Sequence, residues 1–230
     1  VFGPRQAGKS TLVRRLLTGW LHLDLERPRD LALVGADAEA FFTAHPRRVV
    51  LDEAQRLPEL FPVLRHALDR VPTKGRVVLT GSASPALLTT ASETLAGRIG
   101  LLELTPFRMV ELAGTRLAQD RWFWGGYPPV HALAGHRARA EWLDSYVTTL
   151  LERDLPQLGI RLPAVRLRHL AAMLTHVHGN LLNVSDLARS LGVSVPTVAH
   201  DLDVLEGMFL LRRLPPYHTN IQKRLTKSPK

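Results

Sequence analysis

The chain of 230 residues contains no cysteine. This absence excludes disulfide bonds, thiolate zinc sites and cysteine nucleophiles, and it fits a reducing compartment. Long apolar runs are also missing, since no window approaches the roughly 18 apolar residues of a membrane-spanning helix. The N-terminus shows neither the basic segment nor the apolar core of a signal peptide. We therefore expect a soluble, cytoplasmic protein without a membrane partner.

Acidic residues are in short supply. Lys and Arg number 30 against 21 Asp and Glu, which gives a formal net charge of +9. The surplus is denser toward the C-terminus, with 19 basic against 15 acidic residues over 1–150 and 11 against 6 over 151–230. This balance is compatible with a polyanionic partner such as DNA, although many basic proteins bind only nucleotides or acidic proteins.

Helical and strand periods alternate over the first half of the chain. The pattern predicts helices at 9–19, 58–71 and 85–94, and a group of short helices that ends at Pro46. It predicts strands at 20–26 and 49–51, within 75–84 and within 97–107. Strands that alternate with helices imply a parallel sheet covered by helices on both faces. The expected fold class is therefore α/β.

The second half is expected to be helical. Residues 107–159 show a helical pattern interrupted by the turn-rich "WGGYPP", and a further helix is predicted over 164–177. After Asn183 a helix, a turn at Gly192, a second helix over 195–206 and the strand-like "MFLLRRL" follow. This order is typical of a small winged helix-turn-helix domain.

The first loop has the pattern Gly-x-x-x-x-Gly-Lys-Ser of a P-loop. Its glycines let backbone N–H groups wrap a phosphate chain, Lys9 reaches the β and γ phosphates, and Ser10 ligates Mg²⁺. The sequence thus predicts an ATP site with nine residues: Gly3, Pro4, Arg5, Gln6, Ala7, Gly8, Lys9, Ser10 and Thr11. For Arg5 a phosphate contact and a solvent-exposed position both stay open.

Acidic and small polar residues follow two later strands. Asp52 and Glu53 follow the run "VVL", at the sheet edge where open α/β sheets bind ligands. Asp52 is expected to hold Mg²⁺ together with Ser10, and Glu53 to activate the water that attacks the γ-phosphate. In "VVLTGSAS" either Thr80 or Ser82 could sense the γ-phosphate. We therefore expect a P-loop NTPase sheet that uses ATP and Mg²⁺.

Seven stretches carry a resemblance to a known family. They are Gly3–Ser10, "VVLDEAQ", "LTGSAS", "LAGRIG", "GGYPPV", "LDSYVTTLLERD" and "PPYHTNIQKRLTKSPK". In this order they resemble the prokaryotic AAA+-like P-loop ATPases that carry a winged helix and a C-terminal domain of unknown function. The resemblance implies an ATPase core at 1–104, a helical lid or linker at 105–160, a winged helix-turn-helix at 161–215 and a basic tail at 216–230.

The resemblance adds Arg98 as a third catalytic candidate beside Glu53 and Lys9. In the family an arginine recurs just before a strand, and a guanidinium there could stabilise γ-phosphate charge. It would act within its own subunit or on a neighbouring one, which leaves a homo-oligomer open. The alternative is a surface salt bridge.

The expected recognition helix is poorly suited to DNA. Over 195–206 it carries three acids and neither Lys nor Arg, whereas relatives of this kind often place basic residues there. DNA would have to be bound through the wing and the tail, by Arg212, Arg213, Lys223 and Arg224. Direct DNA binding and a solvated charge run are both open interpretations.

The start of the chain affects the strand that is expected to precede the phosphate loop. Only Val1 and Phe2 precede Gly3, although the resemblance implies a central strand there, flanked by the strands that carry Asp52 and Thr80. We expect a chain cut at both ends, with a weakened loop support and without the nuclease-like C-terminal domain of the family.

Three functions follow from these patterns. The leading one is a Mg-dependent ATP hydrolase that couples its nucleotide state to movement of the winged helix. The alternatives are a nucleotide switch or DNA-associated regulator that does not hydrolyse ATP, and an inactive fragment. A small-molecule kinase is disfavoured, because P-loop kinases rarely place a glutamate after the Walker B aspartate.

Overall fold

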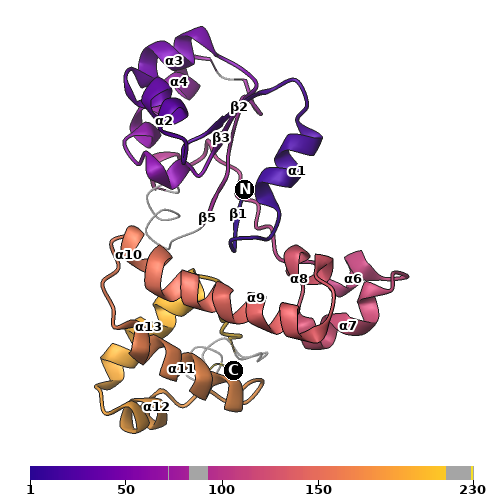
Figure 1. Cartoon of the computed structure of the whole chain (residues 1–230). Coiled ribbons are helices and arrows are strands. Elements are labelled where there is room, and N and C mark those ends of the chain that lie inside the picture. The colour runs from indigo at the N-terminus through magenta and orange to yellow at the C-terminus, as the bar shows by residue number, and fades with distance from the viewer. Residues whose placement is uncertain (72, 83–92, 216–228, 230) are drawn as a thin grey trace, which may run out of the picture. The chain divides into compact units, whose positions relative to one another are not determined.

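The computed structural model describes residues 1–71, 73–82, 93–215 and 229. The chain forms two compact units, residues 1–139 and 140–230 (Figure 1). The helix expected at 85–94 lies almost entirely outside the described residues. The finer division at residues 104, 160 and 215 stays a prediction.

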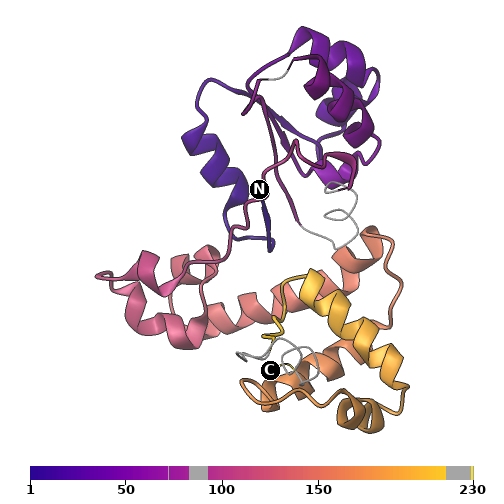
Figure 2. The same ribbon diagram turned by 180° about the vertical axis from the view of Figure 1, so that it is seen from behind.

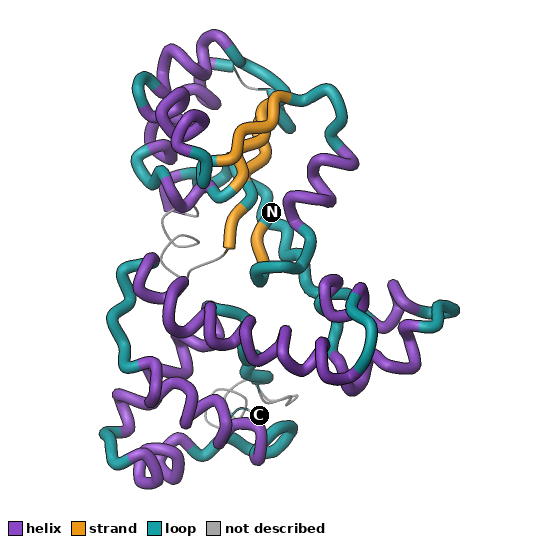
Figure 3. The backbone as a smooth tube through the Cα atoms, viewed as in Figure 1, coloured by secondary structure: helices purple, strands orange, loops and turns teal. Residues whose placement is uncertain are grey.

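A parallel sheet forms the centre of the first unit. Its strands are β2 (Leu21–Asp24), β3 (Val49–Asp52) and β4 (Val77–Leu79), in the order β2-β3-β4 (Figure 3). All four residues of β3 are buried, because its apolar run lies between two neighbouring strands. The predicted parallel α/β sheet is confirmed.

Helices cover both faces of this sheet. Helix α1 (Lys9–Leu16) lies on one face, and α2 (Pro28–Gly35), α3 (Ala38–Ala44) and α4 (Leu60–Arg70) lie on the other (Figures 1 and 2). The buried apolar cluster between α2, α3, α4 and the sheet consists of Leu23, Leu25, Val34, Phe41, Phe42, Val49, Leu51, Leu57, Leu60, Phe61, Leu64 and Leu95. This cluster fixes the strands whose ends carry the candidate site.

The short strand β1 (Phe2–Gly3) does not lie beside β3. It pairs in parallel with β5 (Gly81–Ser82), which continues β4 beyond Thr80. On its other side the Phe2 N–H donates to Leu102 O over 2.9 Å. The expected position next to the strand of Asp52 is therefore wrong, because β2 and β4 already occupy both edges of β3.

The strand expected within residues 97–107 is reduced to a single bridge between Glu103 and Phe2. After this bridge the chain becomes helical, with α6 (Met109–Leu112), α7 (Leu117–Trp124), α8 (Pro128–Ala132), α9 (His136–Thr149), the π-helical segment η2 (Leu150–Asp154) and α10 (Leu155–Gln157). The helical pattern and its break between α7 and α8 are confirmed. None of the described helices is long and apolar enough to cross a membrane.

The second unit contains three further helices. They are α11 (Ala164–His176), α12 (Val184–Leu191) and α13 (Val195–Gly207). Asn183 caps α12 by accepting hydrogen bonds from two backbone N–H groups, and Ser194 caps α13. Between them Gly192 takes the left-handed conformation, φ 66°, that ends α12. The two helices and the turn are confirmed.

The expected wing strand over 208–214 is wrong. These residues form a turn and an irregular segment, beginning with the left-handed Phe209 at φ 59°. Arg213 then binds back to α13, to Glu206 over 2.6 Å and to Asp203 over 2.5 Å. These contacts pull the segment along the helix instead of leaving it extended for pairing. The helix-turn-helix is thus present among the described residues, whereas a winged helix is not confirmed.

A buried ion pair ties α11 to α13. Asp201 is fully buried and accepts two hydrogen bonds from the Arg166 guanidinium, over 2.7 and 2.9 Å. Asp201 lies on the helix that the sequence suggested as a DNA reader, yet its side chain serves the packing of the unit. Such bidentate pairs add geometric specificity to helix packing.

Replacement of Arg166 by Met should destabilise the second unit by about 3 kcal/mol, because it leaves a buried carboxylate without its partner. Guanidinium unfolding followed by circular dichroism measures the loss. Arg168→Met is the matched control on the same helix, since its partner Glu152 is exposed and such pairs contribute under about 1 kcal/mol. Equal effects of the two replacements would contradict this interpretation.

Candidate nucleotide-binding site

The loop between β1 and α1 depends on backbone conformations that side chains rarely adopt. Gly3 has a φ of 149°, and a Cβ atom there would lie 2.1 Å from the carbonyl oxygen of Leu104. Gln6 is left-handed at φ 62°, and Gly8 at φ 95° caps the N-terminus of α1. The two motif glycines therefore stand where the backbone requires them, and α1 begins directly after the loop.

Lys9 is folded back under this loop. Its side chain is 5% exposed, and its ammonium donates to Gly3 O over 3.0 Å and to Pro4 O over 2.8 Å. Burial lowers the pKa of Lys9, while the charges of Glu53 and Asp52 oppose this shift. The ammonium thus lies inside the loop and donates to two neutral carbonyl oxygens. A phosphate oxygen can replace these acceptors and form a stronger, charge-assisted hydrogen bond.

Asp52 and Thr80 meet at the carboxyl end of the sheet. The Thr80 hydroxyl donates to Asp52 Oδ1, and both side chains are more than nine-tenths buried. Two backbone hydrogen bonds hold them there, from Thr80 N–H to Leu51 O and from Ala54 N–H to Thr80 O. The structure thus brings an expected Mg²⁺ ligand and an expected sensor together. The other sensor candidate, Ser82, lies on β5.

Ser10 and Asp52 line the same pocket, of about 250 Å³. Its other lining residues are Val13, Arg14, His22, Leu23, Asp24, Arg27, Asp30, Val50 and Thr80. A hydroxyl and a carboxylate are suitable donors for Mg²⁺, which proteins usually bind with one or two side chains plus substrate phosphates. Among the described residues no group of three His, Asp or Glu could hold a metal alone. The donor set therefore fits a cation that arrives with a nucleotide.

Asp24 is a residue of this pocket that sequence reasoning missed. It is the last residue of β2 and pairs in register with Asp52 on β3. Its N–H donates to Asp30 Oδ2 over 3.0 Å, which joins α2 to the strand end. The signal was present in the sequence, because β2 ends in an acid at the same edge of a parallel sheet as β3.

Glu53 lies just beyond the end of β3 in a strained conformation. Its backbone is left-handed, φ 56° and ψ 47°, which is uncommon for a residue with a side chain. Gln55 donates a hydrogen bond from Nε2 to Glu53 Oε2. The charge of Glu53, more than that of Asp52, opposes the lowering of the Lys9 pKa by burial.

The two expected arginines form ion pairs. Arg5 binds Glu26 over 3.1 Å at the rim of the loop. Arg98 binds both oxygens of Asp69, over 2.5 and 3.1 Å, which lowers the pKa of Asp69 and raises that of Arg98. The structure therefore has the salt bridge that the sequence left open for Arg98.

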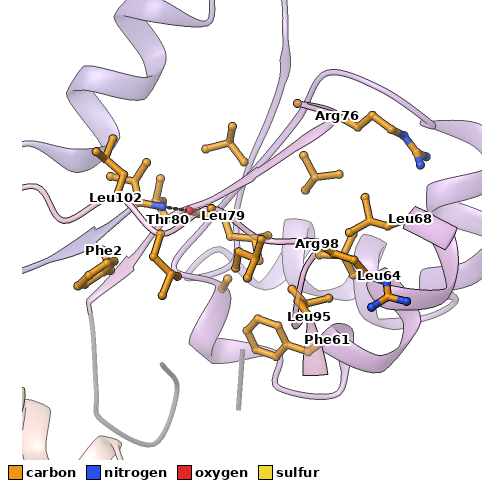
Figure 4. Close-up of a pocket in the computed structure, with 18 of the residues that line it drawn as sticks. Phe2, Phe61, Leu64, Leu68, Arg76, Leu79, Thr80, Leu95, Arg98 and Leu102 are labelled. Atoms are coloured by element: carbon orange, nitrogen blue, oxygen red, sulfur yellow. Dashed lines mark hydrogen bonds between the residues drawn. The ribbon is translucent and has the colours of Figure 1, made fainter. Parts of the chain in front are cut away.

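Arg98 also lines a second, largely apolar pocket of about 290 Å³ (Figure 4). Side chains such as Phe61, Leu64 and Leu102 form most of its wall. Thr80 contributes to both pockets, whereas Ser10 and Asp52 line only the first. The structure thus groups Ser10, Asp52 and Thr80 around one pocket, with Arg98 at the other.

The expected DNA contacts are distributed unevenly. Arg212 is exposed, but Arg213 is already bound to Glu206 and Asp203. Lys223 and Arg224 lie outside the described residues. Of the four expected contacts, Arg212 is therefore the one that, among the described residues, is exposed and has no acidic partner.

Comparison with known proteins divides the chain near residue 114. Residues 1–113 match the family model of an AAA domain, and residues 115–230 match that of a domain of unknown function, DUF8612. Uncharacterized proteins of Mycobacterium bovis and Mycobacterium tuberculosis are each 43% identical over 232 residues. These matches cover 99% of this chain and 52% of each relative, so the chain spans about half the length of the relatives.

Replacement of Gly3 by Ala should destabilise the first unit by about 3 kcal/mol, the upper end of the range for overpacking, because the new Cβ atom collides with a backbone oxygen. Thermal unfolding measures the loss. Gly100→Ala is the control, since a Cβ atom there meets nothing within 4 Å. A Gly3→Ala protein as stable as the control would show that the close contact with Leu104 does not exist.

Proposed function

Because this chain belongs to the family of the DUF8612 domain over residues 115–230 and matches the model of an AAA domain over residues 1–113, we propose that it binds ATP with Mg²⁺ and hydrolyses it. One observation carries the proposal. Lys9 lies under the loop, while Ser10, Asp52 and Thr80 line one pocket at the carboxyl edge of the sheet, where Glu53 directly follows Asp52. These are the groups that phosphoryl transfer to water requires.

Binding begins at the loop. The backbone N–H groups between Gly3 and Thr11 and the N-terminus of α1 favour a phosphate chain. Lys9 exchanges its bonds to two loop carbonyls for bonds to phosphate oxygens. This exchange offsets part of the cost of burying its charge, because a charged acceptor replaces neutral ones.

Ser10 and Asp52 would hold the magnesium ion, Ser10 directly and Asp52 through a water molecule. When bound, Mg²⁺ neutralises charge on the β and γ phosphates. The Thr80 hydroxyl fixes the orientation of the Asp52 carboxylate. Loss or gain of a γ-phosphate nearby changes the field at this hydrogen bond, which makes Thr80 the favoured sensor.

Glu53 is the proposed general base. It accepts a proton from the water that attacks the γ-phosphorus atom, and the bond from this atom to the β–γ bridging oxygen breaks to give ADP and phosphate. Its place directly after Asp52, at the carboxyl end of β3, supports this role. Arg98 enters the proposal only if it leaves Asp69, to act within its own subunit or on a neighbouring one.

We further propose that the nucleotide state moves residues 161–215. The relatives are about twice as long as this chain. The target of this movement is therefore a question about the full-length relatives. The alternative from a different class is a switch in which ATP binding sets a conformation and no hydrolysis takes place. Glu53 distinguishes the two, because only hydrolysis needs a base.

Association of the second unit with DNA is a second candidate function. The observation in its favour is that the three acids of α13 are paired internally, Asp201 with Arg166, and Asp203 and Glu206 with Arg213. Pairing removes much of the repulsion that these acids would exert on a phosphate backbone. The exposed Arg212 would then act as a phosphate contact.

Replacement of Glu53 by Gln should lower the rate of Mg-dependent ATP turnover about 100-fold or more, because the base is lost while the shape is kept. The dissociation constant for ATP should change less than about threefold, since the loop and Lys9 are intact. Phosphate release and nucleotide fluorescence measure the two quantities. Glu59→Gln, at an exposed glutamate, is the matched control. Wild-type protein that binds ATP without turnover would favour the switch instead.

Duplex DNA should bind weakly at low salt, and Arg212→Ala should lower the slope of log affinity against log salt by about one. Fluorescence anisotropy over a salt series measures this slope. Arg65→Ala, at an exposed arginine of α4, is the charge-matched control. No binding at low salt, or equal slopes for both variants, would remove DNA as the partner of this unit.

A further inference from the structure

Gln55 lies in the short 3₁₀ helix η1 (Ala54–Arg56) that begins after Glu53. Glu53 itself is left-handed, so the chain turns sharply after β3. This turn brings the side chains of Glu53 and Gln55 together, and Nε2 of Gln55 donates to Oε2 of Glu53. The proposed base is thus held by a neighbour only two residues away.

The other end of the Gln55 amide is unusual. Its Oε1 atom is buried and accepts no hydrogen bond from the described part of the chain. An ionised carboxylate can only accept hydrogen bonds, so the NH₂ group must face Glu53 and the oxygen must face away. A buried acceptor without a donor is unfavourable and uncommon in native proteins.

The position of Glu53 gives this bond a function. Glu53 directly follows Asp52, the last residue of β3, and Asp52 lines one pocket with Ser10 at the carboxyl edge of the sheet. The charge of Glu53 also opposes the effect of burial on the pKa of Lys9. Gln55 thus fixes the carboxylate that follows the expected Mg²⁺ ligand at this edge.

We propose that Gln55 is a positioning residue, which holds the Glu53 carboxylate in one orientation for the attacking water. The inference rests on the proposed ATP hydrolysis and deepens it. A fixed orientation keeps the base aligned with the water, and misalignment of about 1 Å can cost about 100-fold in rate.

Two replacements of Gln55 test this proposal. Gln55→Met keeps most of the volume but removes the donor, so the turnover number should fall about 10-fold to 100-fold, with the affinity for ATP changed less than about twofold. Gln55→Glu keeps the size and places a second carboxylate beside Glu53. An ionised carboxylate cannot donate to Glu53, so the turnover number should fall at least as far as in Gln55→Met. A purely structural role would lower the stability of the variants and leave the turnover number of the folded protein unchanged.

Control variants separate the proposal from its premise. Gln119→Met repeats the change at an exposed glutamine of α7 and should leave turnover unchanged. In a Glu53→Gln background, Gln55→Met should cause no further loss, because its effect passes through Glu53. If Gln55→Met does not fold, as judged by circular dichroism, the turnover number of the isosteric Gln55→Glu decides alone.

The outcomes are distinct. Wild-type turnover that Glu53→Gln removes, together with unchanged turnover numbers in the folded Gln55 variants, overturns the role of Gln55 and leaves the proposed hydrolysis intact. Absence of wild-type turnover overturns both. Slower turnover in Gln55→Met with an unchanged affinity for ATP, and slower turnover in Gln55→Glu, support the assignment.

Discussion

Two buried charges impose the main constraint on the first unit. Lys9 and Asp52 are only 5% and 7% exposed, and a charge removed from water is tolerated only with partners. Lys9 obtains them from two carbonyls of its own loop, and Asp52 obtains one from Thr80. Lys9 therefore closes its own loop, and Asp52 joins the end of β3 to the junction of β4 with β5. Ser10 lines the same pocket as Asp52 and Thr80.

The predictable part of the fold was the part that is local in sequence. The apolar residues recur with a helical period in α1, α4 and α11 and follow a strand pattern in β2 to β4. These local patterns identify the type of each element. The errors concern pairing over long distances. The position of β1 beside β5 depends on which strand edges are free, and residues 208–214 are shaped by one arginine that binds α13. Neither fact is encoded in a local period.

The same distinction applies to the candidate site. Motif spacing places Ser10, Asp52 and Thr80 at one edge of a parallel sheet, and the structure has them around one pocket. Spacing does not specify which partner a long side chain selects. Arg98 binds Asp69, and Gln55 binds Glu53, because distant or turned segments bring these groups within reach. Side-chain pairing of this kind follows from tertiary packing, which the sequence patterns did not resolve.

Strand β1 joins segments that are far apart in the chain. On one side the Gly81 N–H donates to Val1 O, and on the other the Leu104 N–H donates to Phe2 O. The phosphate loop starts at the next residue, so an opening of the loop that displaces β1 breaks bonds on both sides. The amide protons of Gly81 and Leu104 should therefore exchange with solvent in one cooperative event. Hydrogen exchange would then show that an anion that closes the loop protects the amides of Gly81 and Leu104 as a single unit.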